Sequence, residues 1–303
     1  MHHSFDQHLL LDRDTIRRLS VKSDFPALMK LSIQLVIFMA CVGVLTVSSL
    51  PWYILTPVLL ISGFVTFALY APLHETTHET AFNTSILNKA GAWVTGIIYG
   101  YSPEMHKAFH FTHHRFTNQD ADPEKGFSLP EMPGRTFFQI ILAGILGMVV
   151  PLHSLILSLV PVKFWNRFEA AWTSGYDQRK LQWECRIVSV FWVATFVFLA
   201  ANPVVLTRFL IVLFLARFIH GFVTVSEHEG MADEGHMLYR TRSVVSNRIF
   251  RWFWWNMNFH AEHHTWPSVP FHQLPELHYL ATEKHVHTEN SYVRFFWEGR
   301  YRS

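Results

Sequence analysis

The chain has 303 residues, of which 50% are hydrophobic, 16% are aromatic and only 16% are charged. Soluble domains carry roughly 25% charged residues, so this composition excludes an ordinary soluble domain and predicts an integral membrane protein. The net charge of +2 is too small to indicate a nucleic-acid partner. The two cysteines, Cys41 and Cys185, are too few for a disulfide framework, and we interpret both as free thiols.

The first segment, residues 1–30, is polar and charged. It contains no short apolar core followed by small residues, so we do not expect a signal peptide. Its basic residues are Arg13, Arg17, Arg18, Lys22 and Lys30. An excess of Lys and Arg beside a membrane span is typical of the cytoplasmic side, where we expect this segment to lie.

Two apolar runs follow, at about 31–50 and 52–71. About 20 apolar residues cross a bilayer as a helix, and Pro51 between the runs predicts a tight hairpin. The second run leads directly into the pattern H-E-T-T-H, which contains His74 and His78.

The next polar segment contains H-F-T-H-H, formed by His110, His113 and His114. Positions i, i+3 and i+4 of a helix share one face, so we expect these imidazoles to point together at one site. The apolar stretch before them, residues 90–101, is too short to cross a membrane and predicts an in-plane helix.

Residues 137–160 form an ambiguous fifth apolar stretch, which Pro151 divides. The loop after it, at 161–185, is basic and indicates the cytoplasmic side. A full span here would put the histidines before and after it on opposite sides of the membrane. We therefore expect an in-plane or re-entrant element on the cytoplasmic leaflet.

A second pair of apolar runs, at about 187–201 and 204–225, predicts a second hairpin that turns at Pro203. The shorter run is expected to gain a turn from residues 181–186. The fourth run contains two arginines, Arg208 and Arg217. A charge at the bilayer centre costs roughly 2.5–3.5 kcal/mol, so we expect both side chains to extend to the membrane surfaces, with a substrate contact by Arg217 as the alternative.

Nine histidines in these patterns predict a metal centre. After the fourth run His228 stands alone in S-E-H-E-G, and His260, His263 and His264 form H-A-E-H-H. Nine imidazoles are too many for one four-coordinate zinc ion and suit two metal ions with open positions. Each ligating ring should donate its other N–H to a carboxylate or carbonyl. The neighbouring acids that could accept these N–H groups are Glu75, Glu79, Asp120, Asp122, Glu124, Glu227 and Glu262.

H-E-T-T-H also matches the pattern H-E-x-x-H of zinc metalloproteases, in which two histidines hold zinc and the glutamate acts as the general base. This alternative leaves seven ordered histidines unexplained.

The order of the patterns resembles that of the integral-membrane fatty-acid desaturases. The matching segments are H-E-T-T-H, H-F-T-H-H-R-F-T-N-Q-D-A-D-P-E, S-E-H-E-G and N-F-H-A-E-H-H-T-W-P, and the resemblance covers about residues 74–278. Membrane hydroxylases and carotenoid ketolases and hydroxylases share these patterns. The choice between desaturation and lipid or terpenoid hydroxylation or ketolation therefore stays open.

The resemblance implies a di-iron centre that activates O2 and attacks C–H bonds of a lipid or acyl chain. The implied iron ligands are His74, His78, His110, His113, His114, His228, His260, His263 and His264. Thr224 stands where some animal acyl-CoA desaturases have an asparagine that holds a metal through water, so a hydroxyl contact or a different second iron site is expected. No flavin, haem or iron–sulfur motif is present, so we expect a separate electron donor of ferredoxin, rubredoxin or cytochrome b5 type.

We expect an all-α integral membrane protein with four transmembrane helices in two hairpins, in-plane helices and a cytoplasmic histidine-rich cap. Residues 1–30 form its N-terminal segment, 31–284 the desaturase-like membrane domain and 285–303 a C-terminal tail. Both termini and the metal site are expected on the cytoplasmic side.

Overall fold

The computed structural model describes residues 11–47, 49–125, 135–167, 170–284 and 287–298. Within these ranges the chain is mostly helical, and its two short strands, β1 (Ser243–Val244) and β2 (Thr288–Glu289), pair in parallel. The expected all-α fold is confirmed.

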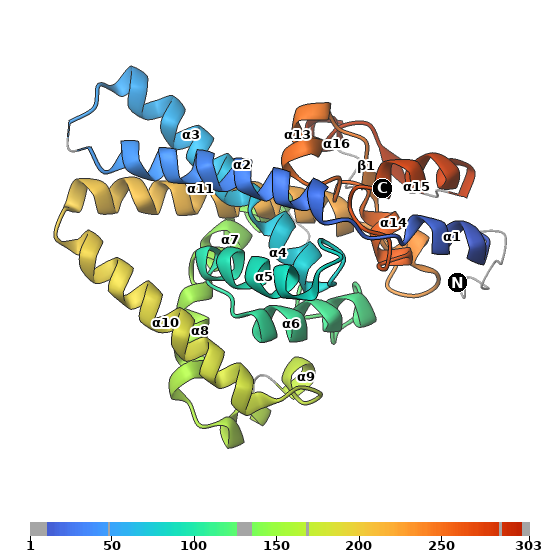
Figure 1. The fold of residues 1–303 in the computed structure, drawn as a ribbon, viewed down its shortest axis with the longest axis horizontal. Coiled ribbons are helices and arrows are strands. Elements are labelled where there is room, and N and C mark those ends of the chain that lie inside the picture. The colour runs from blue at the N-terminus through green and yellow to red at the C-terminus, as the bar shows by residue number, and fades with distance from the viewer. Residues whose placement is uncertain (1–10, 48, 126–134, 168–169, 285–286, 299–303) are drawn as a thin grey trace.

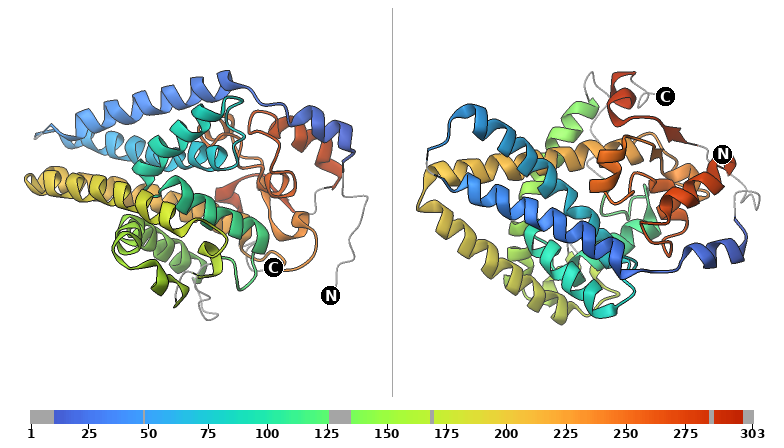
Figure 2. Two further views of the ribbon diagram at one scale, coloured as in Figure 1. Left: turned by 60° about the horizontal axis from the view of Figure 1, so that its bottom comes forward. Right: turned by 45° about the horizontal axis from the view of Figure 1, so that its top comes forward.

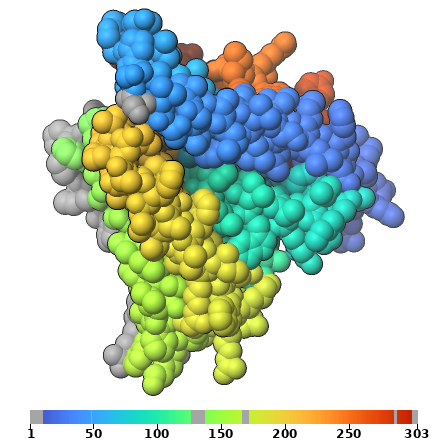
Figure 3. All heavy atoms as spheres, turned by 60° about the vertical axis from the view of Figure 1, so that its left-hand side comes forward, coloured from blue at the N-terminus to red at the C-terminus, as the bar shows by residue number. Residues whose placement is uncertain are grey.

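Four helical segments are long and apolar enough to cross a membrane. They are α2 (Asp24–Leu45), α3 (Trp52–Ala68) with its continuation α4 (Tyr70–Thr77), α10 (Gln178–Ala200) and α11 (Pro203–His228). Figure 1 shows them as two hairpins whose turns lie at the same, left-hand end of the molecule. Figure 3, which views that end, shows α5 (Ser85–Tyr99) between the two hairpins.

The remaining helices form a cap at the other end and a lower layer beside α10 (Figures 1 and 2). The cap contains α1 (Arg13–Leu19), α12 (Met237–Arg240), α13 (Arg248–Phe253), α14 (His260–Thr265), α15 (Leu274–Ala281), η3 (Thr282–Lys284) and α16 (Tyr292–Trp297). The other segments are α6 (Pro103–Phe116), α7 (Arg135–Met148), α8 (Val150–Leu159), η2 (Val162–Arg167) and α9 (Ala170–Thr173).

The helix α2 begins seven residues before its apolar run, and two of its polar side chains bind the cap. Lys30 Nζ donates to the backbone oxygen of Trp252 and Gln34 Nε2 donates to that of Phe253, both at 2.8 Å. These two hydrogen bonds give the buried polar side chains partners and fix α2 to α13.

The ambiguous stretch forms the helix pair α7 and α8, which is bent by 45° and would make a fifth crossing only if both helices are counted as one span. In the structure α7 packs on α11 and α8 packs on α10. Small residues allow the first contact: a Cβ on Gly147 would lie 2.9 Å from Arg217 Cδ, and one on Gly221 would lie 2.9 Å from Ala143 Cβ. The pair thus crosses from one helix of the second hairpin to the other.

Arg208 extends to the first hairpin turn as expected, but neither arginine of α11 reaches water. Arg208 and Arg217 are only 6% and 5% exposed. Arg208 donates to the backbone oxygens of Leu45 and Val47 in the first hairpin turn. Arg217 donates to the backbone oxygen of Tyr99 and lies over that tyrosine ring, 3.8 Å from its centroid. Carbonyl groups at the ends of α2 and α5 therefore replace water as the partners of these charges.

Candidate metal centre

The nine histidines come from four segments that meet where the membrane helices join the cap. His74 lies on α4 and His78 caps its C-terminus, while His228 is the last residue of α11. The second pattern lies on α6, which Ser102 starts by accepting a hydrogen bond from the backbone N–H of Met105. The third pattern forms most of α14.

The structure brings all nine histidines together and divides them into two groups. The first group contains His74, His78, His110, His114 and His263, and the second contains His113, His228, His260 and His264. Within each group the candidate ligand nitrogens lie within 4.8 Å of one another, which is compact enough for one metal ion.

Each of the two triple patterns is split between the groups, which corrects the expectation that its imidazoles point together at one site. His110 and His114 belong to the first group, whereas His113 belongs to the second. Adjacent residues on a helix point about 100° apart, so neighbouring histidines face different sides. The helix α14 is divided in the same way, with His263 in the first group.

Ring nitrogens of the first group face each other at short range. Nε2 of His78 lies 2.8 Å from Nε2 of His110, and Nε2 of His114 lies 3.2 Å from Nε2 of His263. A neutral imidazole has one N–H and one lone pair, so such nitrogens must share either a proton or a cation.

In the second group, Asn118 fixes the tautomer of His228. Its Nδ2 donates to the backbone oxygens of Ala232 and Arg240 at 2.9 and 2.6 Å, so its Oδ1 is the atom 3.2 Å from His228 Nδ1. An amide oxygen only accepts, so Nδ1 of His228 carries the proton and Nε2 presents a lone pair. That lone pair faces Nε2 of His260 at 2.9 Å.

Asp122 orients His113 in the same manner. The His113 Nδ1–H donates to Asp122 Oδ1 at 2.9 Å, and the same carboxylate accepts the backbone N–H groups of Asn118 and Glu124, each at 2.8 Å. Burial opposes ionisation of Asp122, but these donors outweigh it and hold the pKa of Asp122 below its ordinary value. The carboxylate is therefore charged and holds the His113 proton on Nδ1, so Nε2 of His113 presents its lone pair to the second group.

Burial keeps most of these imidazoles neutral, the form that binds metal. It lowers the pKa well below the ordinary histidine value for His78, His110, His114, His260, His263 and His264. His113 is the exception: burial lowers its pKa, but Glu124 and Asp122 together raise it by more.

Besides Asp122, three more of the expected acids lie beside the histidines. Glu75 Oε1 is 3.6 Å from His74 Nδ1, and Glu124 Oε1 is 3.5 Å from His110 Nδ1. Glu227 Oε2 is 3.7 Å from His260 Nδ1.

Other candidates lie elsewhere. Asp120 is fully exposed and pairs with Lys125 Nζ at 2.8 Å, and Glu79 pairs with Lys107 at the surface. Thr224 is half-buried, and within the described residues no hydrogen bond joins its side chain to a histidine of either group. Glu262 is buried and accepts hydrogen bonds from the side chains of Ser243 and His278, which ties α14 to β1 and α15.

Asn118 was not among the site residues predicted from the sequence, although the sequence carried a signal for it. Thr117 ends α6, and Asn118 follows it in the left-handed conformation with φ 63°. Asparagine after a helix end is common because it tolerates this conformation. Thr117, whose Oγ1 lies 3.4 Å from His264 Nδ1, and Tyr292, described below, had no comparable signal.

Buried nitrogens without partners support metal binding. Both ring nitrogens of His74 and Nε2 of His264 are buried with no hydrogen-bond partner among the described residues. Orphaned polar atoms of this kind are rare in native interiors. Gathered imidazole nitrogens are ligands that iron, copper, zinc and nickel accept, so the residues present fit a transition-metal ion in each group.

The sequence of this chain is similar to those of known lipid desaturases. The fatty acid desaturase family model matches residues 50–296. The chain is 25% identical over 256 residues to the sphingolipid delta(4)-desaturase of Candida albicans, an alignment that covers 77% of this chain and 63% of that protein. It is 24% identical over 307 residues to the sphingolipid delta(4)-desaturase/C4-monooxygenase DES2 of Homo sapiens, covering 94% and 87% of the two chains. The chain thus spans slightly less than two thirds of the Candida albicans relative.

Proposed function

Because the chain belongs to the fatty acid desaturase family, we propose that its nine clustered histidines hold two iron ions and that it uses O2 to desaturate the chain of a membrane lipid. Membership of this family makes the protein an oxidoreductase that acts on lipids. The observation that carries the proposal is the division of the histidines into two groups, each compact enough for one ion.

The five histidines of the first group would hold one iron ion and the four of the second group the other. Bound there, iron would supply the redox chemistry needed to attack an unactivated C–H bond with O2. The chain itself fixes the rings. Asp122 and Asn118 accept the outward N–H groups of His113 and His228, so the metal-facing nitrogens keep their orientation. His113 and Asp122 are themselves buried, which limits the access of water to this part of the centre.

The electron balance requires a partner. Removal of two hydrogen atoms from the lipid supplies two electrons, whereas reduction of O2 to two water molecules takes four. We propose that a separate protein of ferredoxin, rubredoxin or cytochrome b5 type supplies the other two electrons, and that two protons come from solvent.

The first substrate to test is a sphingolipid, because the names of the relatives specify one. Hydroxylation is the second candidate reaction, because the human relative is also named a C4-monooxygenase. Mass spectrometry of lipids from cells with and without the protein separates the two: desaturation removes two mass units and hydroxylation adds sixteen.

A zinc protease site is disfavoured by the surroundings of H-E-T-T-H. His74 and His78 share their group with three further histidines, more than a protease site uses. Glu75 Oε2 accepts hydrogen bonds from Thr80 Oγ1 at 3.0 Å and from the Phe271 N–H at 3.2 Å. Peptidase activity that is lost in Glu75→Gln would restore the protease interpretation.

The central test measures metal and lipid together. Protein purified without oxygen should contain close to two irons per chain. His263→Ala in the first group and His264→Ala in the second should each abolish lipid oxidation while the protein still inserts, because the apolar spans place it in the bilayer. His153→Ala on α8, outside both groups, is the matched control and should stay active. One zinc and no iron, or full activity of His263→Ala, would contradict the proposal.

A further inference from the structure

Glu227 on the last turn of α11 lies between the second histidine group and the C-terminal helix α16. Its Oε2 is 3.7 Å from His260 Nδ1, and its Oε1 accepts a hydrogen bond of 2.8 Å from the Tyr292 hydroxyl. Glu227 is 3% exposed and Tyr292 is 5% exposed. One carboxylate oxygen thus faces the histidine group while the other is bound by a residue outside it.

Several contacts hold α16 on the end of α11. The guanidinium of Arg242 donates to the backbone oxygen of Ser226 at 2.5 Å and lies over the Phe295 ring, 4.5 Å from its centroid. The Phe296 ring packs 4.4 Å from that of Phe222 on α11. Pairing of β2 with β1 brings the segment before α16 to the same place. The described part of the expected C-terminal tail therefore packs beside the candidate metal centre.

The position of the proton on His260 determines whether Glu227 can accept it. Nε2 of His260 faces Nε2 of His228. Because Asn118 holds the His228 proton on Nδ1, Nε2 of His228 presents a lone pair. A metal ion held by both nitrogens requires His260 to carry its proton on Nδ1. That atom is buried, has no hydrogen-bond partner among the described residues and faces Glu227 Oε2.

We propose that Tyr292 is a positioning residue for the second metal ion: by binding one oxygen of Glu227, it keeps the other turned toward His260. This inference rests on the proposed function, because it assumes that the second group holds an ion. Burial and the neighbouring Glu227 raise the pKa of Tyr292 well above its ordinary value, so the hydroxyl remains a donor at physiological pH. A carboxylate turned toward a ligating imidazole fixes the ring and makes it a better ligand.

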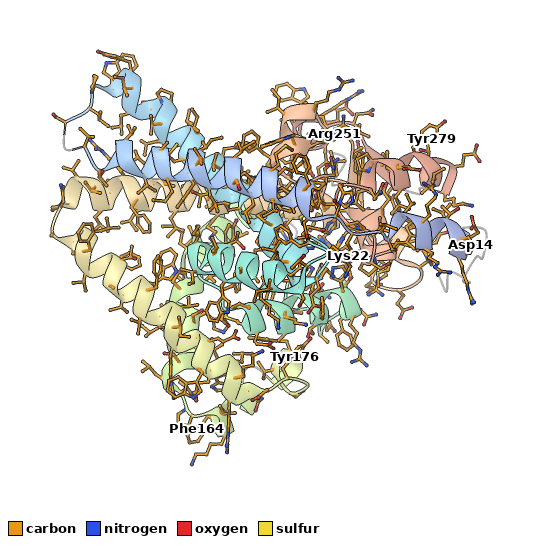
Figure 4. All side chains as sticks on the ribbon, viewed as in Figure 1. Asp14, Lys22, Phe164, Tyr176, Arg251 and Tyr279 are labelled. Atoms are coloured by element: carbon orange, nitrogen blue, oxygen red, sulfur yellow. The ribbon has the colours of Figure 1, made fainter. Side chains whose placement is uncertain are left out.

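The test is the substitution Tyr292→Phe, which removes the hydroxyl and keeps the ring that packs 5.1 Å from Phe250. Metal-free protein in detergent is titrated with Fe(II) under anaerobic conditions. The variant should bind one ion with wild-type affinity and the other about 10–100-fold more weakly. Tyr279→Phe is the matched control, because Tyr279 is 79% exposed and points away from the molecule on α15 (Figure 4).

A second variant separates positioning from folding. Glu227→Gln keeps an oxygen that accepts the Tyr292 hydrogen bond and replaces the oxygen that faces His260 with an NH2 group, which cannot accept the Nδ1 proton, so it should weaken the same ion. Unchanged affinity for both ions in Tyr292→Phe would overturn the inference, as would an equal loss at both sites, which indicates a purely structural role. Wild-type protein that binds no iron would overturn the proposed function itself.

Discussion

Asp120 and Asp122 stand two residues apart, and only Asp122 turns toward the histidines. The sequence offered both as partners of ligating imidazoles and had no means of separating them. The difference comes from the turn after α6, in which Asp122 accepts the backbone N–H groups of Asn118 and Glu124 while Asp120 pairs with Lys125 in solvent.

Asp122→Asn should therefore lower metal affinity and lipid turnover about 10–100-fold, because an amide accepts the His113 proton less strongly than a carboxylate does. Asp120→Asn should leave both unchanged. Iron content after dialysis and product formation from the lipid substrate measure the two effects. Equal losses in the two variants would contradict the role assigned to Asp122.

Histidine spacing was sufficient to predict which nine residues meet, but it could not predict their division into groups. His113 and His114 are adjacent and belong to different groups. Which side of α6 meets which partner depends on how α4, α11 and α14 approach it, and these are contacts between residues far apart in the chain. The partners Asn118 and Tyr292 depend on the same long-range packing.

At the scale of helices, apolar length predicted all four spans, and it placed the turn of the second hairpin and the start of the second span to within one residue, but it missed the other ends. The sequence-based start of the first span lies seven residues after Asp24, because the residues before position 31 are polar and charged. Of these, Lys30 is accommodated by a carbonyl partner on α13 that no local pattern reveals. Neither arginine of α11 reaches water, although Arg208 extends to the first hairpin turn as expected. Their partners are carbonyls of other helices, so neither charge has to reach water.

Arg217 consequently joins three helices: it lies on α11, binds the carbonyl at the C-terminus of α5 and packs against Gly147 of α7. Arg217→Met should lower the free energy of unfolding in detergent by about 2 kcal/mol, the typical contribution of a hydrogen bond to a charged group. The exposed Arg179→Met is the control and should change it little. A stability equal to that of the wild type would show that another donor, such as water, replaces Arg217 at the Tyr99 carbonyl.

At the scale of the whole molecule, the two hairpins place every histidine group at the end opposite the turns. From the basic residues of 1–30 and 161–185 we propose that this end is cytoplasmic. We therefore propose that α7 and α8 do not cross the membrane and that both termini lie on the same side as the histidines.

Cysteine labelling tests this topology. Gly175→Cys should react with an impermeant thiol reagent only from the cytoplasmic side, because position 175 is exposed and has room for a side chain. Val47→Cys in the first hairpin turn should react only from the opposite side. The native Cys41 and Cys185 are buried and should give little background. Labelling of position 175 only from outside would exclude the two-hairpin arrangement.

The position of α14 in the chain also sets an order of events during synthesis. Each histidine group takes at least one member from α14, which follows all four spans. The four spans leave the ribosome before residues 260–264 do, so neither group is complete when the first helices enter the membrane. Insertion would therefore precede the proposed metal loading, and a chain stopped between His228 and His260 should reside in the membrane with only fragments of both groups.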